Sequence, residues 1–158
     1  MTHALFDRRA LLAGAVAAGA SAASPALAQK RSAPVAVTVY KTPWCGCCGG
    51  WVTHLSASGF APKVVELQDL APIRAKHGIA DALASCHTGV VGAYALEGHI
   101  PASDIRKLLK EKPKARGLAV PGMPLGSPGM EMPDGRREPY DTLLVLTDGR
   151  TRVFTRHA

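Results

Sequence analysis

The sequence predicts one α/β domain in which alternating strands and helices are followed by an inserted segment and a C-terminal β-hairpin. Three observations support this class. Residues 35–40 are apolar or β-branched without interruption, which is typical of a buried strand. This strand leads through a cysteine-rich loop into a helical pattern, as expected for an alternating α/β unit. Near the other end, Asp148-Gly149 separates two apolar stretches and predicts a tight hairpin turn.

The first helix and its neighbours can be placed by spacing and by breakers. Thr42-Pro43 ends the first strand, and the helix is expected from Cys47 or Cys48 to Ser58, with Gly59 as its left-handed end. Its core face has apolar side chains at helical spacing, namely Trp51, Val52 and Leu55. A second strand is expected at 63–67.

A short helix is expected at 70–77, where Asp69 can cap its start and Gly78 can end it. Residues 80–83 could add one more helical turn. A single third strand is expected at 90–96, although two glycines weaken that pattern.

The last third of the domain combines an amphipathic helix, an irregular loop and a hairpin. The helix is expected at 103–110 and is stopped by Pro113. Residues 117–135 hold five Gly, four Pro and three Met, which predicts a loop. Strands at 141–146 and 151–155 form the hairpin. This order matches a thioredoxin-like layer whose final helix is expected to be missing or replaced by the inserted segment.

The first 28 residues are expected to be a signal peptide. A charged region ends in Asp7-Arg8-Arg9, an apolar run covers 10–23, and Ala26-Leu27-Ala28 predicts cleavage before Gln29. The apolar run is shorter than the roughly 20 residues that span a bilayer, and no later segment is long enough. Arg8-Arg9 is similar to a twin-arginine signal, with the general secretory route left open. We therefore expect a mature domain at 29–158 in the periplasm, without a membrane span.

Composition narrows the class of function. The chain has 158 residues, 47% of them hydrophobic, which suits one domain with one core. The formal charge is +7, but the basic residues are dispersed and aromatics make up only 5%. Nucleic-acid binding usually needs a basic stripe or stacking aromatics, so no nucleic-acid partner is expected.

The crowding of cysteines is the main sign of chemistry. Cys45 and Cys48 form a Cys-x-x-Cys at a helix start, which is a dithiol-redox arrangement. Backbone N–H groups and the helix dipole favour thiolates at this position. Cys47 adds a third thiol, and three thiolates on one loop suit soft ions, with Cu(I) ahead of Zn²⁺. Because the side chains of adjacent Cys47 and Cys48 diverge, they suit bridging between neighbouring Cu(I) ions. The alternative is one disulfide with one buried cysteine.

Other residues are candidates for the same site. Cys86 is expected to be a fourth thiolate, and His87 beside it is either a ligand or a neighbour of the ligands. Thioethers also bind Cu(I), so Met123, Met130 and Met132 are candidates, with gap filling as an equal alternative. The remaining histidines of the mature chain are expected outside the site, namely His54, His77, His99 and His157.

Several sequence blocks together resemble one bacterial family. They are Val39 to Trp51, Ser85 to Thr88, Glu97 to Pro101, Gly117 to Pro124 and Gly126 to Glu131. The chain resembles the exported Cys-x-Cys-Cys metal-binding family, first catalogued as a domain of unknown function, which includes the CopG-type periplasmic copper-resistance proteins. The resemblance covers about residues 35–155. It implies a thioredoxin-like fold, Cu(I) held by Cys45, Cys47, Cys48 and Cys86, and a role in copper tolerance. It also implies that Glu97 to Pro101 lies near the site, together with the loop that carries Met123, Met130 and Met132, called the methionine loop below.

We therefore expect a periplasmic copper-binding protein with a thiolate site, in which a multinuclear Cu(I) cluster is one form. Its expected partners are copper ions and other periplasmic copper-handling proteins. The alternative is an enzyme, a thiol-disulfide or copper oxidoreductase that uses Cys45 and Cys48. A zinc structural module is a weaker reading, because the chain has enough apolar residues to fold without metal.

Overall fold

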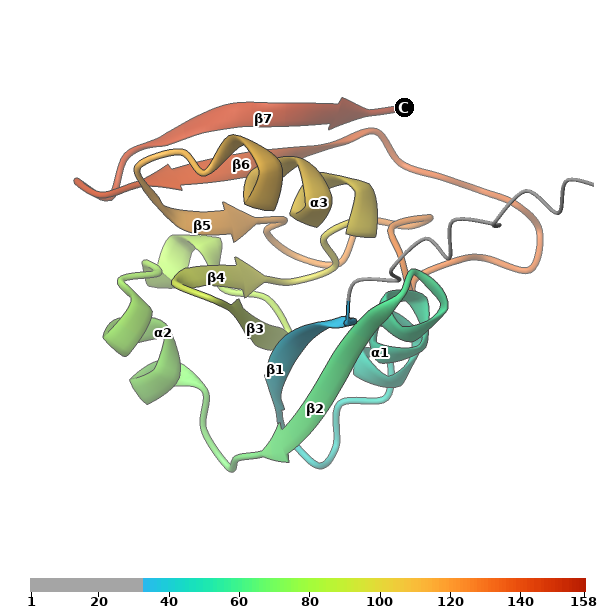
Figure 1. Ribbon diagram of the computed structural model, residues 1–158. Helices are drawn as coiled ribbons and strands as arrows, with labels where there is room; N and C mark the ends of the chain where they lie inside the picture. Colours follow the sequence, from blue (N-terminus) through green and yellow to red (C-terminus); the bar gives the residue numbers. More distant parts are fainter. Residues whose placement is uncertain (1–32) are drawn as a thin grey trace, which may run out of the picture. The chain divides into compact units, whose positions relative to one another are not determined.

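The computed structural model describes residues 33–158. The expected signal peptide at 1–28, its arginine pair and its cleavage site lie outside the described residues. The described part is a mixed α/β unit (Figure 1). None of the helices between residues 33 and 158 combines the length and apolar character that a bilayer crossing requires.

All described strands belong to one seven-stranded sheet. Its order is β2-β1-β3-β4-β5-β6-β7. The strands are β1 (Val35–Lys41), β2 (Phe60–Glu66), β3 (His87–Val91), β4 (Tyr94–Glu97), β5 (Ala115–Ala119), β6 (Tyr140–Leu146) and β7 (Thr151–His157). The helices are α1 (Cys48–Ala57), α2 (Ala71–His77) and α3 (Ala102–Glu111), with a 3₁₀ turn, η1, at Asp81–Leu83.

Helices connect the two parallel strand pairs. β1 and β2 are parallel and joined through α1, and β4 and β5 are parallel and joined through α3. All other neighbouring strands are antiparallel. Parallel neighbours need a crossover, and a helix is its usual form, which explains the position of α1 and α3.

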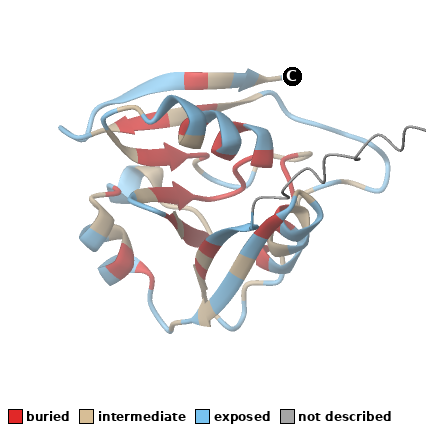
Figure 2. Ribbon diagram, in the orientation of Figure 1, coloured by how far each residue is buried: buried red, intermediate tan, exposed pale blue. Residues whose placement is uncertain are grey.

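The two faces of the sheet have separate apolar layers. On one face, α1 and α3 pack through buried Trp51, Leu55, Ile105 and Leu108 against the strands. On the other face, Ile79 and half-buried Leu83 pack against small side chains of β4, β5 and β6. Burial is concentrated in the central strands (Figure 2). The metal-ligand candidates lie at the end of β1, beside β3.

Most predicted elements occur close to their expected bounds. The first helix, the Asp69–Gly78 helix and the C-terminal hairpin are all present. The backbone N–H of Ala71 donates to Asp69 Oδ1 at 2.8 Å, but the N-cap of α2 is Leu70, so Asp69 lies one residue before the capping position. β2 begins earlier than expected, at Phe60, because that side chain is buried in the main core.

Two expectations are wrong. The single strand at 90–96 is a hairpin, in which Val91 pairs with Tyr94 across a tight turn at Gly92-Ala93. A short apolar stretch carries too little periodicity to show that the chain reverses within it. The expected loop at 117–135 begins inside β5, whose pairing with β4 and β6 joins the C-terminal hairpin to the sheet.

Candidate metal site

The cysteine loop is a tight connection between β1 and α1. The backbone N–H of Cys45 donates to Thr42 O at 3.1 Å, and the N–H of Gly50 donates to Cys47 O at 3.0 Å. Cys48 is the first residue of α1 and is fully buried. The loop therefore presents three cysteine sulfurs at the N-terminus of a helix.

The four cysteines are in two covalent states. Cys45 and Cys48 form a disulfide with Cα atoms 5.7 Å apart. Cys47 and Cys86 are free and half-buried. The Cys-x-x-Cys spacing therefore corresponds to an actual pair in this state.

All four cysteine sulfurs nevertheless lie together. Every pair of these sulfurs is within 4.8 Å. Cys47 Sγ is 3.5 Å from Cys86 Sγ and 3.7 Å from Cys45 Sγ. Cys86, which is 38 residues beyond Cys48 in the chain, reaches the loop because β3 pairs with β1. The structure thus brings together all four cysteines proposed from the sequence.

Two histidines point at the Cys86 sulfur. His87 Nδ1 is 3.2 Å and His99 Nε2 is 3.1 Å from Cys86 Sγ. These three residues form a second metal-capable group, which shares Cys86 with the four cysteines. The residue-based expectation that His99 lies outside the site is wrong. The signal that included it was the family resemblance, which places Glu97 to Pro101 near the site; the β3–β4 hairpin brings this segment back along β3.

The tautomer of His99 is fixed by the methionine loop. His99 Nδ1 lies 2.9 Å from Pro128 O, and a carbonyl can only accept, so Nδ1 carries the proton. The lone pair of Nε2 is therefore free and faces Cys86. Burial lowers the pKa of His99, and burial followed by the nearby His99 lowers the pKa of His87 to about 3. These lowered pKa values favour the neutral imidazole, which is the form that binds metals.

The Cys86 thiol is protonated when no ion is present. Burial, followed by the hydrogen bond and charge of Cys47, raises its pKa to about 12. A metal ion must displace this proton, so metal binding and deprotonation of Cys86 are one event.

One methionine of the loop reaches the sulfurs. Met123 Sδ is 3.8 Å from Cys47 Sγ, and Met123 is 51% exposed. Met130 and Met132 are half-buried in the same loop. Met130 bonds there through its backbone, with its N–H donating to Ser127 O at 2.8 Å.

A hollow of about 440 Å³ opens onto the site. Cys45, Cys47, Cys86 and Met123 line it, together with Trp44, which is 69% exposed. The sulfurs that line the hollow are therefore reachable from outside, whereas Cys48, His87 and His99 are fully buried.

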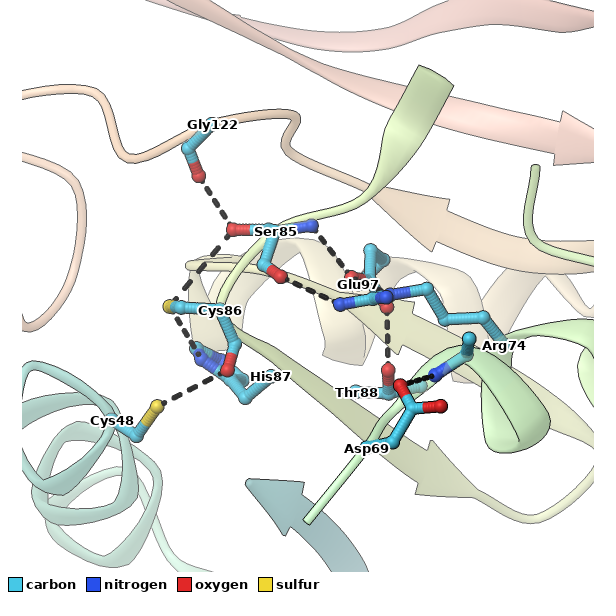
Figure 3. A network of polar contacts seen from close by, with 10 residues as sticks. Cys48, Asp69, Arg74, Ser85, Cys86, His87, Thr88, Glu97 and Gly122 are labelled. Atoms are coloured by element: carbon cyan, nitrogen blue, oxygen red, sulfur yellow. Dashed lines mark hydrogen bonds and ion pairs between the residues drawn. The ribbon is translucent and has the colours of Figure 1, made fainter. Parts of the chain in front are cut away.

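A buried ion pair holds the segment before Cys86 (Figure 3). Arg74 Nε donates to Glu97 Oε1 at 2.9 Å, and Glu97 is fully buried. Glu97 also accepts from the Ser85 N–H at 2.7 Å and from Thr88 Oγ1 at 2.6 Å, while Arg74 Nη2 donates to Ser85 O at 2.9 Å. Both backbone polar groups of Ser85 are thus bound by one ion pair. Sequence reasoning missed Arg74, because nothing in its helix marks it as a partner of β4.

The fold and the site define an α/β protein with a cysteine and histidine group able to hold a metal ion. Residues 83–130 match the family model described as "Protein of unknown function, DUF411". No curated protein matches the chain.

Two solved structures are similar over nearly their whole length. "Copper resistance protein copG- Form 1" is 40% identical, with a TM-score of 0.74, and the match covers 78% of this chain and 98% of that one. "Copper resistance protein copG- Form 2" is 39% identical, with a TM-score of 0.75 and coverage of 79% and 99%. The chain belongs to the CopG-type copper-resistance family, which confirms the resemblance seen in the sequence blocks.

Proposed function

We propose that this protein binds copper as Cu(I) in the periplasm, through Cys45, Cys47, Cys48 and Cys86, and thereby contributes to copper tolerance. The observation that carries the proposal is the meeting of four cysteine sulfurs within 4.8 Å. Metal–thiolate bonds are about 2.3 Å long, so sulfurs that share an ion lie within about 4.6 Å of each other. Thiolates are soft ligands that select Cu(I), with zinc as the less favoured alternative.

The shared position of Cys86 supports more than one ion. Cys86 belongs both to the four-cysteine group and to the group with His87 and His99. A thiolate that serves two groups can bridge two ions. His99 suits a ligand role best, because its Nε2 lone pair is aimed at this sulfur, and Met123 adds a thioether on the outer side. Copper-handling partner proteins would approach at this outer side, where Trp44 and Met123 are exposed.

A thioredoxin-like core is part of the proposal. β1, α1 and β2 form a βαβ unit with the Cys-x-x-Cys at the helix start, which is the setting of thioredoxin-like redox motifs. The β3–β4 hairpin followed by α3 would complete that core, and β5 to β7 would then be an extension of its sheet.

The disulfide favours a second candidate, a copper oxidoreductase. In this reaction the Cys45 and Cys48 thiols form their disulfide, release two protons and pass two electrons to two Cu(II) ions, which become two Cu(I) ions. The observed Cys45–Cys48 bond is the product state of that reaction. Cys47 would not be consumed in it.

Serine variants separate the two functions. The reduced protein, starting at Gln29, is titrated without oxygen against a Cu(I) chelator, and bound copper per protein is measured. For a thiolate cluster, Cys47→Ser should lose copper as severely as Cys45→Ser, because a bridging thiolate serves more than one ion. The control is Ser56→Ala on the exposed side of α1, which should bind copper normally. Full copper loading of Cys47→Ser, with Cu(II) reduction lost in Cys45→Ser, would reject the cluster and support the oxidoreductase. If the protein retains zinc but loses copper to a weak chelator, copper is not the metal that this site selects.

A further inference from the structure

Disulfide formation leaves a set of soft donors unused. With Cys45 and Cys48 bonded to each other, their sulfurs are no longer thiolates. Cys47 and Cys86 remain free, and their sulfurs are 3.5 Å apart. That separation is below the limit of about 4.6 Å for two sulfurs bound to one ion.

Two further donors flank this pair from opposite sides. Met123 Sδ lies 3.8 Å from Cys47 Sγ on the exposed side, and His99 Nε2 lies 3.1 Å from Cys86 Sγ on the buried side. Two thiolates, a thioether and a neutral imidazole form a soft donor set, which suits Cu(I). The set includes neither sulfur of the disulfide.

Two members of this set, Cys86 and His99, are held by groups other than the disulfide sulfurs. The segment at Cys86 is held through Ser85 by Arg74 and Glu97. His99 is oriented by its hydrogen bond to Pro128 O. Preorganised ligands lower the ordering cost of binding. An ion can enter because the hollow of about 440 Å³ exposes both Cys47 and Cys86.

We infer that the disulfide form of this protein retains one Cu(I), bound by Cys47, Cys86, His99 and Met123, so that the Cys45–Cys48 pair controls how much copper the protein holds. This inference rests on the proposed function, because it assumes copper as the cargo. A dithiol reductant that breaks the disulfide supplies two electrons and two protons, and is itself oxidised to a disulfide. The two thiols that result release their protons to the solvent and bind additional Cu(I) as thiolates, and the copper capacity rises. A two-electron oxidant, such as two Cu(II) ions that become Cu(I), re-forms the disulfide, the additional Cu(I) is released, and the single ion remains.

The experiment compares two defined states of the protein starting at Gln29. The oxidised form is accepted only when alkylation labels two thiols and peptide mapping assigns them to Cys47 and Cys86. The fully reduced form must show four labelled thiols. Both are titrated with Cu(I) without oxygen against a colorimetric Cu(I) chelator, and copper per protein is counted after gel filtration. We expect one Cu(I) in the oxidised form and more than one in the reduced form.

Variants identify the ligands in the oxidised form. Cys47→Ser and Cys86→Ser should abolish the single ion, and Met123→Leu should weaken it by about tenfold or more, on the scale of groups that support a metal site. The double variant Cys45→Ser/Cys48→Ser removes the disulfide but keeps the donor set. It should hold one Cu(I) even under reducing conditions, and it provides a second route if the oxidised form proves difficult to prepare.

The outcomes separate this inference from the proposed function. An oxidised form that binds no copper, beside a reduced form that does, overturns the inference and leaves the proposed function intact. Equal copper in both forms also overturns it, because the disulfide would then not control capacity. A reduced form without Cu(I) rejects the proposed function and the inference with it.

Discussion

At the scale of single residues, Cys86 links the exposed and the buried halves of the site. Its sulfur faces Cys47 on one side and two imidazole nitrogens on the other. Within residues 33–158, His87 Nε2 is buried without a hydrogen-bond partner, which is uncommon for a polar atom in a folded core. The other ring nitrogen, His87 Nδ1, is the one that faces Cys86, so the buried half of the site is polar and only partly hydrogen-bonded.

Glu97→Gln tests the ion pair that holds the Cys86 segment. The amide keeps the shape of the carboxylate but removes the charge that pairs with Arg74, whose side chain is only 14% exposed. We expect the free energy of unfolding to fall by about 3–5 kcal/mol, because a largely buried guanidinium loses its charged partner. Urea unfolding of the metal-free protein measures this loss.

The matched control is Glu66→Gln. Glu66 pairs with Lys41 at 3.0 Å, but its side chain is 56% exposed. Water screens such pairs, so its loss should cost less than about 1 kcal/mol. If both variants lose the same free energy of unfolding, burial does not increase the contribution of the Arg74–Glu97 pair to stability.

At the scale of elements, the methionine loop is held against the start of α1 by a close backbone approach. Gly129 has φ +86°, and a Cβ built on it would lie 2.5 Å from Trp51 N. This contact places Pro128 where its carbonyl oxygen accepts from His99. The loop therefore contributes both the orientation of one imidazole and the thioether of Met123.

Gly129→Ala should separate the loop from α1. A left-handed backbone costs an L-residue about 1–2 kcal/mol, and the clash with Trp51 N adds roughly 1–3 kcal/mol. The control is Gly135→Ala in the same loop, where φ is +74° but the space around the Cβ is open, so only the backbone cost applies. Thermal unfolding compares the two. A Gly135→Ala variant that is as unstable as Gly129→Ala would show that the approach to α1 contributes nothing.

His54 connects α1 to α3 and makes this contact sensitive to pH. The His54 side chain is half-buried, and its Nε2 accepts the Ala102 N–H at 3.0 Å. Burial lowers the pKa of His54 below its usual value of 6.5, Arg106 lowers it further, and Glu131 partly opposes both. The unfolded chain therefore binds a proton more readily than the folded one, and stability falls as pH drops below about 6.5.

His54→Gln should reduce this pH dependence, because the amide oxygen can accept the same N–H without titrating. Urea midpoints at pH 7 and pH 5 should differ less in the variant than in the wild type. Some dependence remains, since burial also lowers the pKa of His77, His87 and His99. An unchanged difference between the two midpoints would exclude His54 as a contributor.

At the scale of the whole molecule, one sheet joins the site to the C-terminal hairpin. β1 ends just before the cysteine loop, and β3 begins directly after Cys86. In the sheet, β4 and β5 lie between these strands and the hairpin of β6 and β7. The two edge strands are β2 and β7, and they carry features that discourage pairing with other chains. Pro62 lies in β2, and Arg152 and Arg156 lie in β7.

Export is the prediction that concerns the whole chain. Cell fractionation should place a cleaved protein beginning near Gln29 in the periplasm, as the apolar run and the Ala-x-Ala pattern predict. Replacing Arg8 and Arg9 together by lysine should block a twin-arginine route and leave general secretion almost unchanged. Uncleaved protein in the cytoplasm would contradict the predicted compartment.

The sequence by itself determined the elements and the residues whose signals are local. The cysteine loop lies between a strand and a helix because the apolar run, Thr42-Pro43 and the helical spacing all act within a few residues. The C-terminal hairpin follows from Asp148-Gly149 in the same way. The crowding of three cysteines and the scarcity of others predicted the four cysteines whose sulfurs the structure brings together.

Only the tertiary structure decided what surrounds those cysteines. His99 joins Cys86 because the chain reverses at Gly92-Ala93, and Arg74 reaches Glu97 because α2 covers that face of the sheet. β5 forms because β4 and β6 supply hydrogen-bond partners on both of its sides, although its own sequence contains Gly117. These contacts join residues far apart in the chain, and their free energy comes from burial and pairing that exist only once the sheet is assembled. A single sequence carries no local signal for them.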